Sequence, residues 1–393
     1  MAEIITPRDE AELAEAVAVA AGAGTPIEIR GGGTRAGLGR PVQVEATLST
    51  AGLSGITLYE PGALTLVVKA GTPMAEVEAA LAAEGQILPF EPMDHRALLG
   101  TGDESGGEPT IGGVVACGVS GPRRIQAGAC RDAMLGVRFV NGRGEAVKSG
   151  GRVMKNVTGY DLVKLMCGSH GTLGVLSEIS FKVLPKPEAE ATLVCSGLGP
   201  VAGVAALNTA LASPFGITGA AHLDGGAGGR SVVRIEGLAG SVAYRTGQLL
   251  GLLGAGWEAV SGAESTALWR EVRDVAPFAG CDGAVWRISV KPADGPALSD
   301  ALRAAGLDHA ALYDWGGGLV WLSTAETGDA GAGLIRRETA ALGGHATLVR
   351  ASAATRTAVE VFEPEPATLA RISAGLRAKF DPAGILNPGR MRG

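Results

Sequence analysis

The sequence predicts an α+β protein made of two mixed regions and a tail. In the first region, alternating strands and helices are interrupted by glycine-rich stretches, and Pro185 and Pro187 end it. In the second region, alanine-rich helices separate the predicted strands. These observations predict domains at 1–187 and 188–350, followed by a C-terminal helix and tail at 351–393.

The overall composition excludes several classes of protein. The 393 residues suffice for two or three domains, and the net charge of −6 disfavours nucleic-acid binding. No apolar run reaches the eighteen or so residues of a spanning helix, and the N-terminus lacks a secretory signal pattern. The five cysteines are an odd number without a Cys-x-x-Cys pair. We therefore expect a cytoplasmic protein with reduced thiols and no metal site.

The first region is expected to begin with a helix that Thr6 caps and Pro7 starts, ending near Gly22. The stretch 98–131 is too irregular for standard elements, and loops of that length are usually functional or disordered. The remaining elements are predicted as strands over 26–30, 65–71, 135–140, 146–149 and 175–184, a turn at Asn141-Gly142, a helix to residue 83 capped by Thr72 with Pro73 in its first turn, and a helix over 161–167.

The second region is expected to form an antiparallel sheet with helices on one side. All five tryptophans lie between 257 and 321, which suits either a buried core or a protein–protein surface where partners dock. The predicted elements are strands over 231–236, 285–291 and 319–323 and helices over 201–211, 241–253 and 297–305, with a tail helix over 366–380.

Glycine accounts for 62 residues, so about 1.5 Gly-Gly-Gly triplets arise by chance and the two present mean nothing alone. Residues 31–36 fit the G-x-G-x-x-A dinucleotide pattern after a strand. A dinucleotide turn must open a helix, however, and Gly37, Gly39 and Pro41 prevent one here. The stretch is therefore either a nest of backbone N–H groups for phosphate or a plain flexible loop.

Further glycine-rich stretches at 109–118, 155–162 and 168–176 would allow several loops to converge on one long ligand with a central pyrophosphate. In order, I-R-G-G-G-T, T-I-G-G, K-N-V-T-G-Y-D-L and G-T-L-G-V-L-S-E-I resemble the FAD-binding domain of the vanillyl-alcohol oxidase/p-cresol methylhydroxylase (PCMH) family. The tail F-D-P-A-G-I-L-N-P-G resembles the D-lactate and glycolate dehydrogenase branch, and within it the FAD-binding subunits of glycolate oxidases.

The resemblance implies a PCMH-type FAD-binding domain of two α+β subdomains, a smaller antiparallel α+β cap domain, and a tail that returns to the FAD domain. It also implies which residues bind FAD: Arg30, Gly31, Gly32, Gly33, Thr34, Arg35, Pro92, Thr110, Ile111, Gly112, Gly113, Cys117, Gly118, Gly121, Gly171, Gly174, Ile179 and Asn387. Thr34 stands where covalent members carry a flavin-linking histidine, so non-covalent FAD is expected. Cys117 and Cys130 are the alternative linking residues, and Cys117 is interpreted as a small buried hydrophobic residue.

Catalytic members of the branch carry H-x-G-D-G-N-x-H, whose histidine can take the hydroxyl proton of the substrate. This motif is missing here, and His222, before Leu-Asp-Gly-Gly, is its nearest approach. We interpret His222 as a surface or turn residue. Arg123 and Arg124 are weak candidates for binding a substrate carboxylate, and a solvated basic pair is the alternative interpretation. No catalytic residue is assigned.

The resemblance implies an FAD-binding subunit of a glycolate oxidase (glycolate dehydrogenase) complex that oxidises glycolate to glyoxylate. Electrons would pass through flavin to an iron–sulfur partner, with a catalytic flavoprotein subunit beside it. The complex would be cytoplasmic or peripheral on the inner membrane through its partners. The alternatives are a stand-alone FAD-dependent D-2-hydroxy-acid dehydrogenase acting on D-lactate or glycolate, and a non-catalytic flavoprotein scaffold.

Overall fold

The computed structural model describes residues 3–102, 107–152, 159–225 and 228–392. The chain divides into a first unit, formed by 1–120, 129–186 and 364–393, and a second unit, formed by 121–128 and 187–363. Two segments therefore depart from the expected domains. Residues 121–128 join the second unit because their helix packs against one of its strands. Residues 351–363 also join it, since Val359 and Val361 are part of its hydrophobic core.

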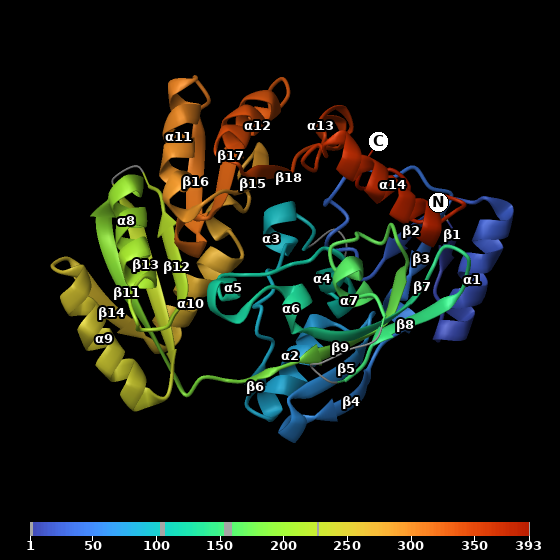
Figure 1. Ribbon diagram of the computed structural model, residues 1–393, viewed down its shortest axis with the longest axis horizontal. Coiled ribbons are helices and arrows are strands. Elements are labelled where there is room, and N and C mark those ends of the chain that lie inside the picture. The colour runs from blue at the N-terminus through green and yellow to red at the C-terminus, as the bar shows by residue number, and fades with distance from the viewer. Residues whose placement is uncertain (1–2, 103–106, 153–158, 226–227, 393) are drawn as a thin grey trace. The chain divides into compact units, whose positions relative to one another are not determined.

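The first unit contains two main sheets, which correspond to the two expected α+β subdomains (Figure 1). A parallel sheet has the order β1 (Glu3–Ile5), β3 (Ala46–Ser49), β2 (Ile27–Arg30). An antiparallel sheet has the order β4 (Ile56–Glu60), β5 (Thr65–Lys69), β9 (Val175–Lys182), β7 (Met134–Val140), β8 (Ala146–Gly150), and β6 (Gln86–Ile87) pairs with β10 (Leu184–Pro185). The helices are α1 (Glu10–Ala23), α2 (Met74–Ala83), α3 (Arg96–Leu99), α4 (Ile111–Ala116), α6 (Cys130–Ala133), α7 (Leu162–Met166) and α14 (Ala367–Phe380).

The N-termini of α1 and α2 differ from the predicted caps. The Asp9 carboxylate accepts hydrogen bonds from the N–H groups of Ala11 and Glu12, so Asp9 is the cap of α1 in place of Thr6. The Thr72 hydroxyl is bonded to backbone atoms of Gly55 and Lys69, and it does not cap α2. At α1 the first backbone N–H groups are therefore satisfied by Asp9, and at α2 Pro73 is the N-cap and no side chain caps the helix.

The expectation that 98–131 holds no standard element is wrong. The stretch contains α4 and α6, and α5 (Arg124–Ala127) of the second unit lies between them in sequence. Each helix has one or two turns, which is too short to produce an apolar period. The predicted β7–β8 hairpin is present, and Asn141 N–H donates to the Glu145 carbonyl at its turn.

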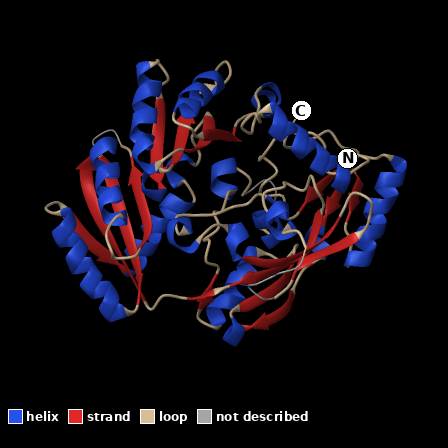
Figure 2. Ribbon diagram, viewed as in Figure 1, coloured by secondary structure: helices blue, strands red, loops and turns tan. Residues whose placement is uncertain are grey.

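The second unit is built on one antiparallel sheet of eight strands (Figure 2). Its order is β14 (Trp257–Ser261), β11 (Ala189–Leu198), β13 (Gly229–Gly237), β12 (Ile217–Leu223), β16 (His309–Asp314), β17 (Leu319–Thr324), β15 (Ala284–Ser289), β18 (His345–Arg350). Besides α5, its helices are α8 (Pro200–Leu211), α9 (Ala239–Leu253), α10 (Gly262–Arg273), α11 (Gly295–Ala304), α12 (Ala332–Ala341) and α13 (Ala353–Ala358). This is the antiparallel α+β architecture that the sequence predicts for the cap domain.

Helices cover both faces of this sheet, which corrects the expectation of helices on one side. On β11, Leu193 packs into a core with residues of α8 and α9. The adjacent Thr192 points to the other face, because side chains alternate along a strand. There its hydroxyl accepts a hydrogen bond of 2.8 Å from Trp269 Nε1 of α10.

Four of the five tryptophans are buried, namely Trp269, Trp286, Trp315 and Trp321. These four rings therefore belong to the interior, and they do not support the interpretation of the tryptophans as an exposed docking surface. Among the described residues, no helix is both long and apolar enough to cross a bilayer.

Candidate functional site

The first unit contains a cavity that is partly open to solvent. Its walls come from the glycine stretch after β2, from α4, from the loop before β9 and from the C-terminal tail. The structure thus gathers four segments that are far apart in sequence and that all carry predicted motifs.

Thirteen of the predicted FAD-binding residues line this cavity: Arg30, Gly31, Gly32, Gly33, Thr34, Arg35, Thr110, Gly112, Gly113, Cys117, Gly171, Gly174 and Asn387. Five do not, namely Pro92, Ile111, Gly118, Gly121 and Ile179. Ile111 and Ile179 are fully buried, Gly121 belongs to the second unit, and Gly118 faces the backbone of Gly168. Pro92 is followed by Met93, whose carbonyl contacts Arg35. The motif residues 155–158 lie outside the described residues.

Two of the glycines are required by close contact with the residues just before α4, a side chain in the case of Gly31 and the backbone in the case of Gly32. A Cβ atom on Gly31 would lie 2.3 Å from the Thr110 hydroxyl oxygen, and one on Gly32 would lie 1.7 Å from the Glu108 carbonyl oxygen. Any side chain at Gly32 would therefore push the two segments apart. The glycine stretch after β2 and the segment before α4 form one continuous wall for this reason.

The tail closes the cavity through two residues. The Asn387 side chain accepts a hydrogen bond from Ile29 N–H at 2.8 Å and donates one to the His170 carbonyl at 2.7 Å. Arg390 donates to Glu28 Oε1 at 2.6 Å and to the carbonyls of Ala36 and Leu38 at 3.2 Å each. The sequence analysis predicted that the tail returns to the first unit, and it counted Asn387 among the FAD-binding residues. It did not identify Arg390.

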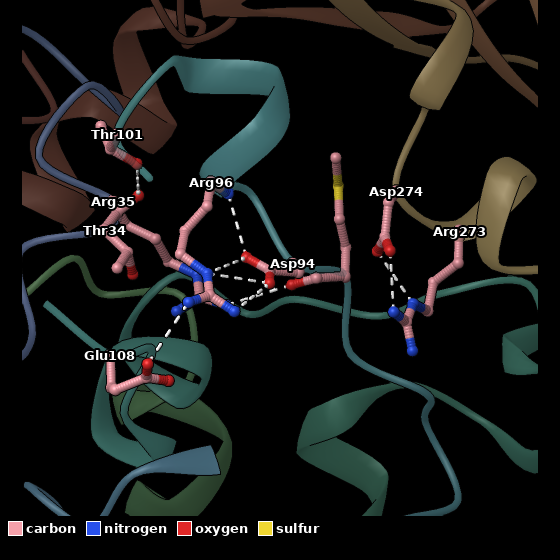
Figure 3. Close-up of polar contacts among 9 residues, drawn as sticks. Thr34, Arg35, Asp94, Arg96, Thr101, Glu108, Arg273 and Asp274 are labelled. Atoms are coloured by element: carbon pink, nitrogen blue, oxygen red, sulfur yellow. Dashed lines mark hydrogen bonds and ion pairs between the residues drawn. The ribbon is translucent and has the colours of Figure 1, made fainter. Parts of the chain in front are cut away.

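Further contacts fix the glycine stretch from the side of α3 (Figure 3). Thr101 donates to the Thr34 carbonyl at 3.0 Å, and Arg35 donates to the Met93 carbonyl at 3.1 Å. Arg96 lies nearby and pairs with Asp94 at 2.8 Å. These hydrogen bonds connect the glycine stretch to residues 93–101.

The charged residues that line the cavity are Arg30, Arg35, Arg390 and Glu28. Glu28 accepts hydrogen bonds from both Arg30 and Arg390, so the wall carries an excess of positive charge. Among the described residues, the buried Arg35 Nε has no hydrogen-bond partner, and burial lowers the pKa of this guanidinium. An unsatisfied cationic donor beside glycine backbone fits a phosphate group, so the cavity suits the pyrophosphate of a dinucleotide.

The remaining titratable residues of the cavity add no charge at neutral pH. Burial, reinforced by Arg390, lowers the pKa of His170 to about 4, so its imidazole is neutral. Burial raises the pKa of Cys117, which lines the cavity as a half-buried thiol where the sequence suggested full burial. Cys130 is buried and does not line the cavity, and its contact with Cys167 raises its pKa.

Two catalytic candidates serve structural roles in the second unit. Arg123 forms two hydrogen bonds with the Glu236 carboxylate, at 2.6 and 3.1 Å. His222 lies on β12, fully buried, with Nδ1 at 2.8 Å from Ser231 Oγ, so its interpretation as a surface or turn residue is wrong. Burial lowers the pKa of His222. Arg124 differs, because its guanidinium stacks at 4.2 Å on the ring of Trp315.

Comparison with known proteins gives a consistent result. Residues 1–150 match the family model described as an FAD binding domain. The chain is 39% identical over 369 residues to glycolate oxidase subunit GlcE of Escherichia coli K12, covering 93% of each protein. It is 30% identical over 192 residues to glycolate oxidase subunit GlcD of Bacillus subtilis, covering 49% of this chain and 38% of the relative.

A solved structure of alkyldihydroxyacetonephosphate synthase shares the fold, with a TM-score of 0.66 at 16% identity. The superposition covers 98% of this chain and 76% of the synthase. The cationic, glycine-lined cavity belongs to a chain whose residues 1–150 match the FAD binding domain family. By its identity to GlcE over nearly the whole length of both proteins, the chain belongs to the glycolate oxidase subunit GlcE family of FAD-binding oxidoreductases.

Proposed function

We propose that this chain is the FAD-binding subunit of a glycolate oxidase (glycolate dehydrogenase) complex that oxidises glycolate to glyoxylate. The observation that carries the proposal is the 39% identity to a glycolate oxidase subunit over 93% of both chains. In this proposal an iron–sulfur subunit and a catalytic flavoprotein subunit complete the complex, which works in the cytoplasm or at the cytoplasmic face of the inner membrane.

FAD, when bound, supplies the two-electron acceptor. The residues from Gly31 to Arg35 would hold its pyrophosphate through backbone N–H groups and the Arg35 guanidinium, and the wall around Thr110 would continue along the cofactor. In this proposal FAD is bound non-covalently. Thr34 has no imidazole that could link to the flavin, and the raised pKa of the Cys117 thiol keeps it protonated and poorly nucleophilic.

Oxidation of the substrate is assigned chiefly to another subunit. The chain lacks the paired-histidine motif, and His222 is fully buried and bonded to Ser231. A base in that position cannot take a proton from a substrate hydroxyl group, because proton transfer needs direct contact or one bridging water.

The proposal is tested by measuring dye reduction with glycolate and D-lactate, first with the chain alone and then with the partner subunits added. We expect negligible turnover by the chain alone and activity when the partners are present. The chain should co-purify with both partners, and acid precipitation should release all of the flavin into the supernatant. Rapid turnover by the chain alone would favour the stand-alone dehydrogenase, and failure to assemble would refute membership of the complex.

A further inference from the structure

The C-terminal helix α14 of the first unit has no buried side. It runs over 14 residues, from Ala367 to Phe380, and none of them is buried. Every other described helix of ten or more residues buries at least two of its residues. In Figure 1 the helix lies along the upper edge of the first unit. It therefore presents a surface that the described part of the chain does not cover.

One side of α14 is an exposed apolar stripe. Leu369, Ile372 and Leu376 are exposed by 48%, 53% and 36%, and their spacing of three and four residues puts them on one face of the helix. Beside the stripe, a Cβ added at Gly375 would meet nothing within 4 Å, so this side of the helix faces open space. A helix normally turns such a stripe toward a core. Here only an occupant from outside the described part of the chain would bury it.

Positive charge accompanies the stripe. The helix contains Arg371, Arg377 and Lys379 and no acidic residue, although the whole chain has a net charge of −6. Arg371 and Lys379 are exposed, and within the described residues none of the three side chains makes an ion pair or a hydrogen bond. On a helix of 3.6 residues per turn, Lys379 and Arg377 lie on opposite sides of the stripe. The surface of α14 is thus apolar at its centre and cationic at its edges.

The acidic residues next to α14 in sequence are engaged elsewhere. Glu365 pairs with Arg392 at 2.9 Å, and Glu363 lies 3.9 Å from Arg336. Asp381, directly after the helix, is buried. The positive charge of α14 is therefore available to an anionic partner.

Contacts on its other side hold α14 in place. The Phe380 ring lies with its centre 6.0 Å from that of Phe139 on β7, and Gly142 N–H donates to the Phe380 carbonyl at 2.8 Å. Closer to the start of the helix, the Ser373 hydroxyl donates to Glu365 at 3.1 Å. Because the helix is already formed and attached, binding at its exposed side requires no rearrangement.

We propose that α14 binds this chain to an anionic lipid bilayer, lying in the headgroup layer with its apolar stripe toward the acyl chains. An amphipathic helix of this kind binds through its apolar area and through the attraction of Lys and Arg to anionic headgroups. A second copy of the chain is a poorer occupant, because two such helices would bring like charges together. The stripe also lacks the Trp and Tyr side chains that are enriched among the anchors of protein interfaces. The proposal stands on α14 alone and depends neither on the substrate nor on the partners proposed above.

Co-sedimentation of the purified full chain with vesicles tests the proposal. The vesicles consist of phosphatidylcholine alone or with about one third phosphatidylglycerol, and the bound fraction should be at least about threefold larger on the anionic vesicles. Added salt should lower that fraction by screening. The double variant Arg371→Gln/Lys379→Gln should bind both kinds of vesicle equally weakly. The triple variant Leu369→Ser/Ile372→Ser/Leu376→Ser should bind anionic vesicles at least about fivefold less.

The double variant Leu252→Ser/Arg270→Gln is the matched control. Leu252 on α9 is exposed by 47%, and Arg270 on α10 is also exposed. Its bound fraction should stay within about twofold of the unsubstituted chain, because isolated surface changes have small effects. The proposal is overturned if the chain does not bind anionic vesicles, if it binds neutral ones equally well, or if the α14 variants bind normally. It is also overturned if these variants lose only co-purification with partner subunits, which would make α14 a protein interface. Flavin content and dye reduction report on the proposed function separately.

Discussion

The two units bring charged side chains together by different means. In the first unit the cavity wall is mostly backbone, and it exists because Gly31 and Gly32 allow two segments to touch. In the second unit the notable groups are side chains, and strand register brings Arg124 and Arg287 to the ring of Trp315. A site built from backbone atoms depends on positions where side chains are missing. A site built from side chains depends on which residues face one another.

The largest effect should come from adding one methyl group to the backbone wall. In Gly32→Ala the new Cβ would meet the Glu108 carbonyl oxygen at 1.7 Å, so the wall must open. We expect the flavin-to-protein ratio of the purified variant to fall at least about tenfold. Gly62→Ala is the control, because a Cβ there meets nothing within 4 Å. Equal flavin content in both variants would mean that the wall does not hold FAD.

The same distinction explains how much could be predicted from the sequence. The glycine stretches could be identified from the sequence because a backbone site needs glycines close together. Thirteen of the residues expected to bind FAD line one cavity. The positions of Arg390 and Arg287 could not be predicted from the sequence, since a single arginine in a tail or strand stands in no recognisable motif. The boundary at Pro185 and Pro187 was visible, but the excursion of 121–128 into the second unit was not, because it depends on tertiary packing of α5.

A second test addresses the core of the second unit. The Trp286 ring is fully buried, and its Nε1 donates to the Ala330 carbonyl at 3.0 Å. Trp286→Ala should lower the free energy of unfolding by about 3–5 kcal/mol in denaturant titration. The half-buried Trp257 offers the comparison, and Trp257→Ala should cost clearly less. Comparable losses would show that burial does not distinguish the two rings, and lost assembly without lost stability would restore the interpretation of Trp286 as a docking residue.

A smaller effect should appear in the pH dependence of stability. The pKa of His170 falls from its usual 6.5 to about 4 on folding, so the unfolded chain binds a proton between these values that the folded chain does not. Stability should therefore decrease as the pH falls from about 6.5 to 4, by roughly 3 kcal/mol for this residue. His170→Asn suits the left-handed backbone and should reduce that decrease in unfolding experiments. An unchanged pH profile would show that His170 titrates normally in the folded protein.

The central claim is that this chain carries FAD but leaves substrate oxidation to a partner. The most direct measurement is the absorbance spectrum of the purified chain, recorded anaerobically before and after glycolate is added. We predict the absorption bands of oxidised flavin in the first spectrum and their persistence in the second. Absence of flavin from the folded chain would contradict the assignment of the cavity, and bleaching by glycolate alone would show that the chain is itself the dehydrogenase.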